Sequence, residues 1–178
     1  AAERAQAAEE LAGAPSARDP WQAEVQRRAL GLKVRIDRAK ARVAAGDPAA
    51  AWKELEPLAG RTDELALVDT QFQVLIAWGK PEEVLARYAV LAPELAQSSL
   101  LTMKKVLALR ALGRVEEALA ALAEELRRNP AHPNGPALQG EILSGLGRSA
   151  EAAAAFERAR ANGDRTLATA LALAAALG

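Results

Sequence analysis

The chain has no cysteine and only one histidine among its 178 residues. Disulfides and thiolate metal sites are therefore excluded, and a single histidine cannot supply a zinc signature. The richness in Ala, Leu and Arg indicates a bacterial protein. The absence of cysteine fits a reducing and an oxidising compartment equally, so the bacterial cytoplasm and the periplasm both remain open.

The chemistry that an enzyme requires is also sparse. The one histidine, His132, lies beside prolines in an expected loop, where an ordinary surface side chain is far more common than a catalytic one. There is no Gly-rich phosphate loop, because GLGR at 145–148 recurs as ALGR at 111–114 in a helix-turn pattern. Acidic pairs such as Glu124 and Glu125 are most simply solvent-facing. The sequence predicts a protein that is not an enzyme, with no catalytic residue, no metal and no cofactor.

The chain also has no charge excess, few aromatic residues and no long apolar run. Lys and Arg number 23, as do Asp and Glu, and aromatic residues make up only 3% of the chain. A nucleic-acid-binding protein normally shows a basic excess, so we expect no nucleic-acid partner. No apolar run approaches the roughly 20 residues that span a bilayer, which predicts no transmembrane segment in this chain.

What the chain does contain is a repeat. The stretch ALGRVEEALAAL at 111–122 returns, lightly rewritten, as GLGRSAEAAAAF at 145–156, a shift of 34 residues. Glycines recur at spacings of 33, 34 and 34, at Gly46, Gly79, Gly113 and Gly147. A small residue follows each glycine, at Ala51, Val84, Ala118 and Ala152. Four residues later comes a large one, at Leu55, Tyr88, Leu122 and Phe156. Residues spaced i, i+4 share one helix face, so each pair predicts a helix-helix contact.

The glycines have a conformational explanation. Each follows a helical stretch, where a residue in the left-handed conformation commonly ends the helix. Pro48 and Pro81 come shortly after the first two glycines. Proline suits the first position of a helix, because its missing N–H would have no partner there. The repeating unit is therefore a helix, a glycine turn and a second helix.

This unit resembles the tetratricopeptide repeat family. The resemblance implies an all-α fold, an α-α superhelix of about four helix-turn-helix repeats, with extra N-terminal helices and a C-terminal helix. The expected divisions are an N-terminal extension or degenerate repeat at 1–31, repeats over 32–164, and a capping helix or first helix of a fifth repeat at 165–178. The four repeats are expected at about 32–64, 65–98, 99–132 and 133–164.

Several positions depart from the family pattern. Where the family has a large leucine early in the first helix, this chain has Arg38, Gln71, Lys105 and Gln139. Where the family has a small residue next to that position, the second repeat has Phe72. These departures place polar or oversized side chains at expected helix contacts.

The two ends extend the array. Residues 3–12 predict a short helix, and Asp19-Pro20 predicts the start of another, because Asp is a frequent N-cap and Pro suits the next position. Apolar spacing continues through Gly31, which favours one helix over about 20–45, although a break at Gly31 remains open. Residues 165–177 predict a helix that is uncharged beyond Arg165, whose apolar surface could drive self-association.

The resemblance implies that the concave face of the superhelix binds peptides or helices of other proteins. Some family members clamp a terminal carboxylate, but of the corresponding positions here only Lys40 fits, so we reject that subtype. In the third repeat the inward stripe is expected to carry an apolar centre that a partner would cover; the alternative is packing against neighbouring helices. The candidate partner-binding residues are Asp69, Gln73, Ile76, Leu100, Met103, Leu107, Arg110 and Glu141.

The sequence therefore predicts a non-catalytic bacterial scaffold that binds a peptide or an amphipathic helix of another protein. The alternative is a structural spacer or an oligomerisation segment of a larger envelope or exopolysaccharide secretion assembly.

Overall fold

The structure is a computed structural model that describes residues 20–177. The helix expected at 3–12 lies outside the described residues. Every regular element between residues 20 and 177 is helical, which confirms the all-α fold. The elements are α2 (Pro20–Ala44), α3 (Pro48–Leu55), a 3-10 turn (Glu56–Leu58), α4 (Leu65–Ala77), α5 (Pro81–Tyr88), α6 (Pro93–Ala96), α7 (Ser99–Ala111), α8 (Val115–Arg128), α9 (Gly135–Gly145), α10 (Ser149–Ala161) and α11 (Leu167–Leu177).

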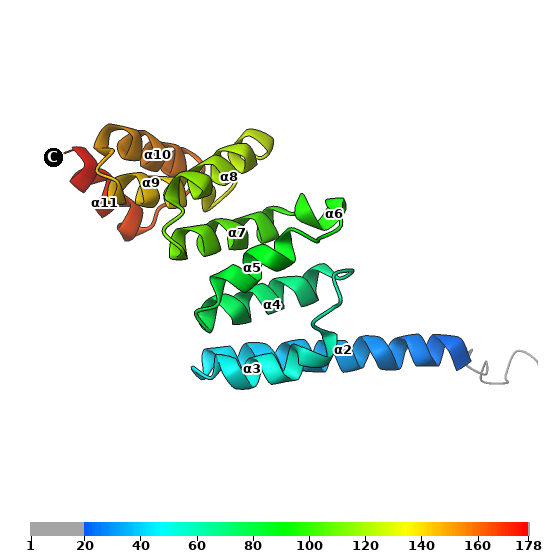
Figure 1. The fold of residues 1–178 in the computed structure, drawn as a ribbon. Helices are drawn as coiled ribbons and strands as arrows, with labels where there is room; N and C mark the ends of the chain where they lie inside the picture. Colours follow the sequence, from blue (N-terminus) through cyan, green and yellow to red (C-terminus); the bar gives the residue numbers. More distant parts are fainter. Residues whose placement is uncertain (1–19, 178) are drawn as a thin grey trace, which may run out of the picture.

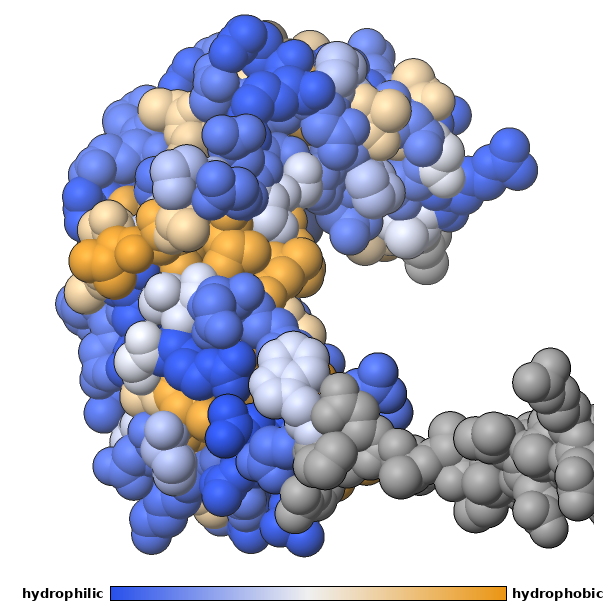
Figure 2. Space-filling view, turned by 90° about the vertical axis from the view of Figure 1, so that its right-hand side faces the viewer, coloured by the Kyte–Doolittle hydropathy of each residue, from blue (hydrophilic) through white to orange (hydrophobic). Residues whose placement is uncertain are grey.

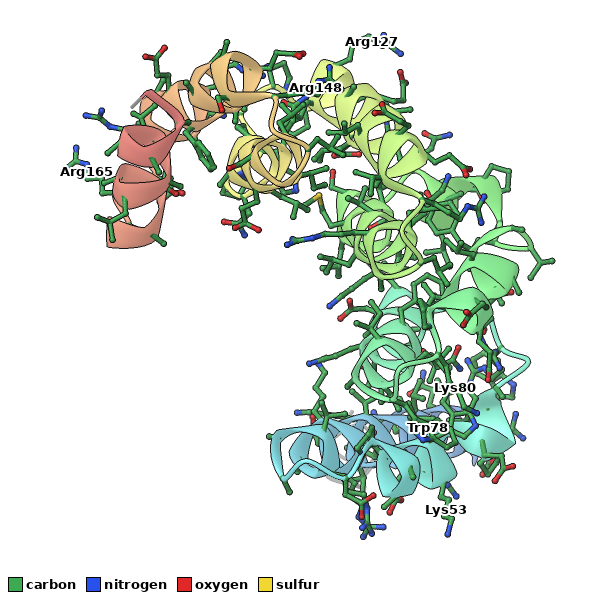
Figure 3. The ribbon with its side chains drawn as sticks, turned by 60° about the vertical axis from the view of Figure 1, so that its left-hand side comes forward. Lys53, Trp78, Lys80, Arg127, Arg148 and Arg165 are labelled. Carbon is green, nitrogen blue, oxygen red and sulfur yellow. The ribbon has the colours of Figure 1, made fainter. Side chains whose placement is uncertain are left out.

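The helices form pairs that stack into a curved array (Figure 1). The four pairs are α2/α3, α4/α5, α7/α8 and α9/α10, called here the first to the fourth pair. Figure 3 shows α4, α7, α9 and α11 along the inner side of the arc and α5, α8 and α10 along its outer side, where Arg127 and Arg148 point away from the hollow. The array is therefore a two-layered superhelix whose concave face is formed by α4, α7, α9 and α11. The division of the whole chain at the expected repeat boundaries remains a proposal.

The glycine turns have the predicted backbone geometry. Gly46, Gly79, Gly113 and Gly147 have φ angles of 78°, 72°, 70° and 71°, the left-handed region that favours glycine. At one of them, the Gly113 N–H donates to the Arg110 carbonyl at 3.0 Å and the Arg114 N–H donates to the Leu109 carbonyl at 2.9 Å. These two bonds satisfy carbonyl groups that the helix end would otherwise leave unpaired.

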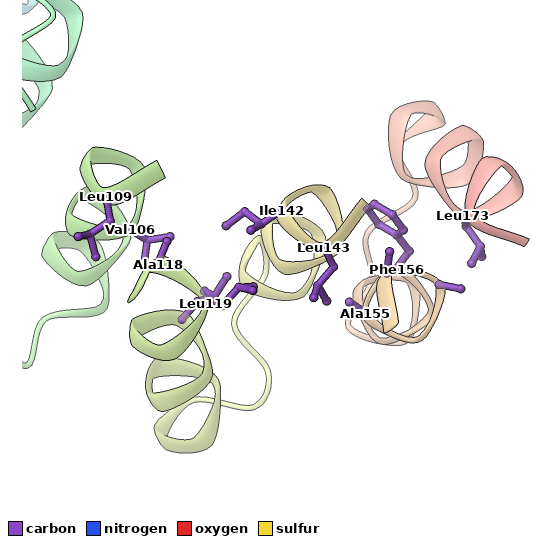
Figure 4. Packing of buried hydrophobic residues seen from close by; sticks show 12 residues of the cluster. Val106, Leu109, Ala118, Leu119, Ile142, Leu143, Ala155, Phe156 and Leu173 are labelled. Carbon is purple, nitrogen blue, oxygen red and sulfur yellow. The ribbon is translucent and has the colours of Figure 1, made fainter. Parts of the chain in front are cut away.

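The small and large residues that follow each glycine form the contacts between helices. Ala118 and Ala152 are fully buried, as the pattern predicts, and a hydrophobic cluster runs from Val106 on α7 to Leu173 on α11 (Figure 4). Small side chains let helix backbones approach closely, and the large neighbour fills the remaining space. The core is therefore continuous through the C-terminal half of the stack.

The long N-terminal helix settles an open alternative. Residues 20–44 form one helix without a break at Gly31. At 1.5 Å per residue this helix is about 37 Å long. Its face toward α3 and α4 buries Leu32, Ile36 and Ala39.

The outer helices of the first two pairs are short. α3 and α5 have eight residues each, whereas α8 has 14 and α10 has 13. Side chains from neighbouring helices donate to the carbonyls left beyond the end of α3. Gln71 Nε2 donates to the Leu58 carbonyl at 2.9 Å, and Arg87 Nη1 donates to the Ala59 carbonyl. Gln71 is buried at a position where the family has an apolar residue, and its side-chain amide donates to this partly buried carbonyl.

Glu125 corrects an expectation. The sequence suggested a solvated pair with Glu124, but the side chain of Glu125 is only 1% exposed. It accepts from Arg128 Nη2 at 2.7 Å and from the Ser99 hydroxyl. Arg128 also donates to the Gln97 carbonyl at 3.0 Å. This buried carboxylate therefore ties the start of α7 to the end of α8, and its charge is balanced where it lies.

The C-terminal helix packs back on the stack. α11 contacts α10 and α9, and Leu173 is buried in the shared cluster. Leu171 remains 62% exposed, so some apolar surface of α11 faces solvent. Self-association through this helix stays a prediction, and only Leu171 can test it, because a charge at Leu173 would disturb the core. Within residues 20–177, no helix combines the length and the apolar character needed to cross a membrane.

Candidate functional site

The concave face contains a hollow where α7, α9 and α11 meet. Its volume is about 470 Å³. The lining is Leu100, Met103, Lys104, Leu107, His132, Asn134, Ala137, Leu138, Glu141, Asp164, Thr166, Ala168 and Thr169. We call this site the α7–α11 groove.

Three large apolar side chains of α7 line the groove. Leu100 is 44% exposed, and Met103 and Leu107 are half-buried. Met103 also packs against the core cluster. The stripe therefore has both a packing role, at Met103, and an exposed apolar side chain, at Leu100. Figure 2 shows hydrophobic residues gathered midway along the arc and reaching the edge of its hollowed side. An exposed apolar strip with a polar rim is the usual character of a binding groove.

The structure brings only part of the predicted set together. Leu100, Met103, Leu107 and Glu141 line the groove, and Arg110 lies beside it through its contact with Glu141. The α4 residues Asp69, Gln73 and Ile76 do not line it. All three are half-buried, and Ile76 packs against the hydrophobic cluster of the second pair. Partner binding by any of these eight residues remains a prediction.

The charged residues of the concave face pair with each other across adjacent inner helices. Lys104 Nζ lies 3.6 Å from Asp69 Oδ1, and Arg110 Nη1 lies 3.1 Å from Glu141 Oε2. Asp69 Oδ1 is buried and has no hydrogen-bond donor, so the nearby ammonium is what balances its charge. The expected polar rim is therefore largely neutralised within the chain.

His132 is not the surface side chain that the sequence suggested. It is only 8% exposed. Its Nδ1 accepts from the backbone N–H of Gly135 at 2.9 Å and of Asn134 at 3.2 Å. The first N–H groups of a helix lack partners within the helix, so His132 caps the start of α9. Its place in the groove wall is structural.

A second hollow, of about 660 Å³, lies between α10 and α11. Its lining includes Glu157, Arg160, Asp164 and Arg165, with alanine as its only apolar residue type. It offers no large apolar side chain to anchor a partner. The α7–α11 groove is therefore the better candidate.

Comparisons with known proteins identify the type of fold. None of the known family models matches the sequence, and none of the curated proteins does. Among solved structures, a tetratricopeptide repeat protein from Parabacteroides merdae ATCC 43184 has a TM-score of 0.64 at 18% identity, over 83% of this chain and 59% of that protein. A mutant of MamA has a TM-score of 0.59 at 17% identity, over 84% of this chain and 87% of that protein. This chain has a tetratricopeptide-type fold.

In this tetratricopeptide-type arrangement, α11 occupies the position of the next inner helix. It packs against α10 and α9, much as α7 packs against α5 and α4. Counting two periods of 34 from Leu100 and Met103 gives Ala168 and Leu171 on α11. Ala168 lines the groove, as this register predicts. Extending the inward stripe into the C-terminal helix would have found this wall from the sequence.

Asp164 holds α11 against the groove. Its carboxylate accepts from the Thr169 hydroxyl at 2.6 Å and from the Thr166 N–H at 2.9 Å. These hydrogen bonds, the one from Thr169 foremost, hold the pKa of Asp164 below its ordinary value. In the described part of the chain, no three acidic or histidine side chains gather as they would around a metal ion.

Proposed function

We propose that the chain is a non-catalytic scaffold that binds a peptide or an amphipathic helix of another protein in the α7–α11 groove. The observation that carries the proposal is the apolar strip of Leu100, Met103 and Leu107 along a hollow of about 470 Å³. An amphipathic helix or an extended peptide would place apolar side chains on this strip. Leu171 on α11 would extend the strip to the far wall.

The pairing of the rim charges favours an apolar mode of binding. Lys104 and Arg110 already face Asp69 and Glu141, so a charged partner would have to break these ion pairs. Apolar contact area supplies most of the free energy in such a groove, and the fully buried centre contributes more than the rim. We therefore expect that added salt weakens binding in the groove only slightly.

The test uses Leu100, the most exposed member of the strip, together with Leu171 on α11, which the 34-residue register aligns with Met103. Met103 and Leu107 are half-buried, so a glutamate at either position could unfold the chain. The double variant Leu100→Glu/Leu171→Glu instead changes side chains that are 44% and 62% exposed. The control, Leu65→Glu/Val90→Glu, changes side chains that are 39% and 71% exposed and lie outside the groove lining.

Each variant is used as bait with lysate of the source organism, and captured proteins are compared by mass spectrometry. We expect a partner that the wild-type chain and the control retain and the groove variant loses. Circular dichroism confirms that both variants fold. A partner retained by the groove variant would place the binding site elsewhere, and loss from both variants would show non-specific capture.

A further inference from the structure

The outer face of α2 closes the N-terminal end of the described stack. α2 packs on α3 and α4 through Leu32, Ile36 and Ala39. Leu30 and Val34 lie on the opposite side, 64% and 46% exposed. Residues spaced i, i+4 lie about 40° apart around a helix, so the two side chains form one narrow apolar seam. No element within residues 20–177 covers this seam.

Basic side chains flank the seam. α2 carries seven Lys and Arg residues against two Asp and Glu, a net charge of +5 in a chain whose total charge is zero. Helical geometry places Lys33 and Lys40 on one side of the Leu30–Val34 seam and Arg38 on the other. All three are exposed, and none forms an ion pair within the described chain. Asp37, about one turn beyond Val34, is the one acidic residue near the seam.

We propose that the outer face of α2 is a second docking surface, which binds an acidic amphipathic helix of another protein. The partner helix places an apolar pair against Leu30 and Val34. Its Asp and Glu residues lie on both sides of that pair, opposite Lys33 and Lys40 and opposite Arg38. Opposite charges that flank an apolar seam align two helices and select the partner. This surface is separate from the α7–α11 groove, which α2 does not line.

The same observations disfavour other occupants. Two copies of the chain meeting through this face would bring together two helices of net charge +5, which repel each other. A membrane-surface helix needs a broad apolar face. The seam has two aliphatic side chains, with the carboxylate of Asp37 beside them. A nucleic acid would use the basic residues and leave the apolar seam without a function.

The test uses a phage-displayed library of helical peptides that carry a fixed leucine pair at i, i+4 and random residues on both sides of it. The folded wild-type chain is the target. We expect the selected peptides to be enriched in Asp and Glu at the flanking positions. Selected peptides are then synthesised, and their affinity is measured by fluorescence anisotropy.

Two double variants change the net charge equally, one beside the seam and one far from it. They distinguish binding at the seam from a general effect of the net charge of the chain. Lys33→Glu/Lys40→Glu should weaken binding of the selected peptides about tenfold. Arg160→Glu/Arg165→Glu changes exposed residues at the other end of the arc, where Figure 3 shows Arg165, and should leave binding nearly unchanged. Circular dichroism checks both folds.

Four results would overturn the proposal. These are selection without acidic enrichment, equal weakening by both double variants, binding to phosphatidylglycerol vesicles that Lys33→Glu/Lys40→Glu abolishes, and a concentration-dependent mass that the same variant abolishes. The last two would assign the face to lipid and to a second copy of the chain.

Discussion

The second and fourth helix pairs fill the same helix-helix contact from opposite sides. In the second pair the large residue is Phe72 on the inner helix, fully buried with its ring centre 6.4 Å from that of Tyr88 on the outer helix. In the fourth pair the corresponding inner residue is Gly140, and Phe156 comes from the outer helix. A Cβ on Gly140 would lie 2.6 Å from the Phe156 ring. The fold therefore constrains the combined volume of the two positions and not the residue at either one.

The structure around the contact depends on whether the inner or the outer helix supplies the large residue. Phe156 is 1% exposed, whereas Tyr88 is only half-buried and ends its short helix. The Tyr88 hydroxyl donates to the Ala96 carbonyl at 2.6 Å, at the end of α6. The extra turn α6 thus accompanies the pair in which the inner residue is large. The third pair is intermediate, with Val106 and Leu122, both fully buried.

The largest expected effect comes from removing the large inner residue. Phe72→Ala should lower the free energy of unfolding by about 3–5 kcal/mol, because it leaves a cavity at a fully buried site. Val106→Ala, at the corresponding position of the third pair, should cost less because fewer atoms are removed. Urea denaturation measures both. Equal losses would contradict the view that the contact of the second pair is filled mainly from the inner helix.

The second prediction adds volume where the inner residue is smallest. Gly140→Val should cost about 3 kcal/mol, because its side chain would overlap the ring of Phe156. The double variant Gly140→Val/Phe156→Leu reproduces the residues of the third pair, Val106 and Leu122. It should recover at least part of the lost stability. A double variant as unstable as the sum of the single variants would show that the two positions are independent.

Much of this fold could be predicted from the sequence, because its turns and periods are local. The 34-residue glycine period predicted the four left-handed turns. The helical spacing of the apolar residues predicted that α2 continues without a break at Gly31. The period also predicted the burial of Ala118 and Ala152. These features depend on residues close in the sequence, where helical geometry fixes their relation.

Polar contacts between helix pairs could not be predicted in the same way. The burial of Glu125 depends on Ser99, which lies 26 residues earlier, and Gln71 bonds to a carbonyl 13 residues earlier. His132 is buried because it caps the helix that follows. The candidate residues were predicted on α4, α7 and α9, of which the α4 residues do not line the groove, and the α11 wall was missed because the inward stripe was not continued into that helix.

The third prediction compares two glutamines at equivalent positions of the second and fourth pairs. Gln71 is buried and donates to the Leu58 carbonyl, whereas Gln139 is half-buried and accepts from Arg158 in an exposed hydrogen bond. Gln71→Ala should cost about 1–2 kcal/mol, because it leaves a carbonyl without its donor. Gln139→Ala should change the free energy of unfolding by less than about 0.5 kcal/mol. Urea denaturation measures both variants. A larger loss of stability for Gln139→Ala than for Gln71→Ala would contradict this prediction.

The smallest expected effect concerns how the two ends of the stack are fastened, and it depends on pH. At the N-terminal end, Asp47 caps α3 by accepting from the Ala50 N–H. At the C-terminal end, Asp164 accepts from the Thr169 hydroxyl of α11 and from the Thr166 N–H just before that helix, and its pKa lies below the ordinary value near 3.8. A lowered pKa means that the ionised carboxylate stabilises the attachment. This contribution is complete above the ordinary pKa and is lost as the pH falls through the lowered value.

Acidification from neutral pH to below the ordinary pKa near 3.8 should therefore begin to loosen α11 before the rest of the chain unfolds. The methyl resonances of Leu173, buried between α11 and the cluster, report the change by NMR. Asp164→Asn keeps a carbonyl oxygen as acceptor but cannot titrate, so the resonances of that variant should hold steady over the same range. A shift of equal size and midpoint in Asp164→Asn would assign the pH dependence to another carboxylate. The attachment of α11 would then depend on the burial of Leu173 and not on the cap.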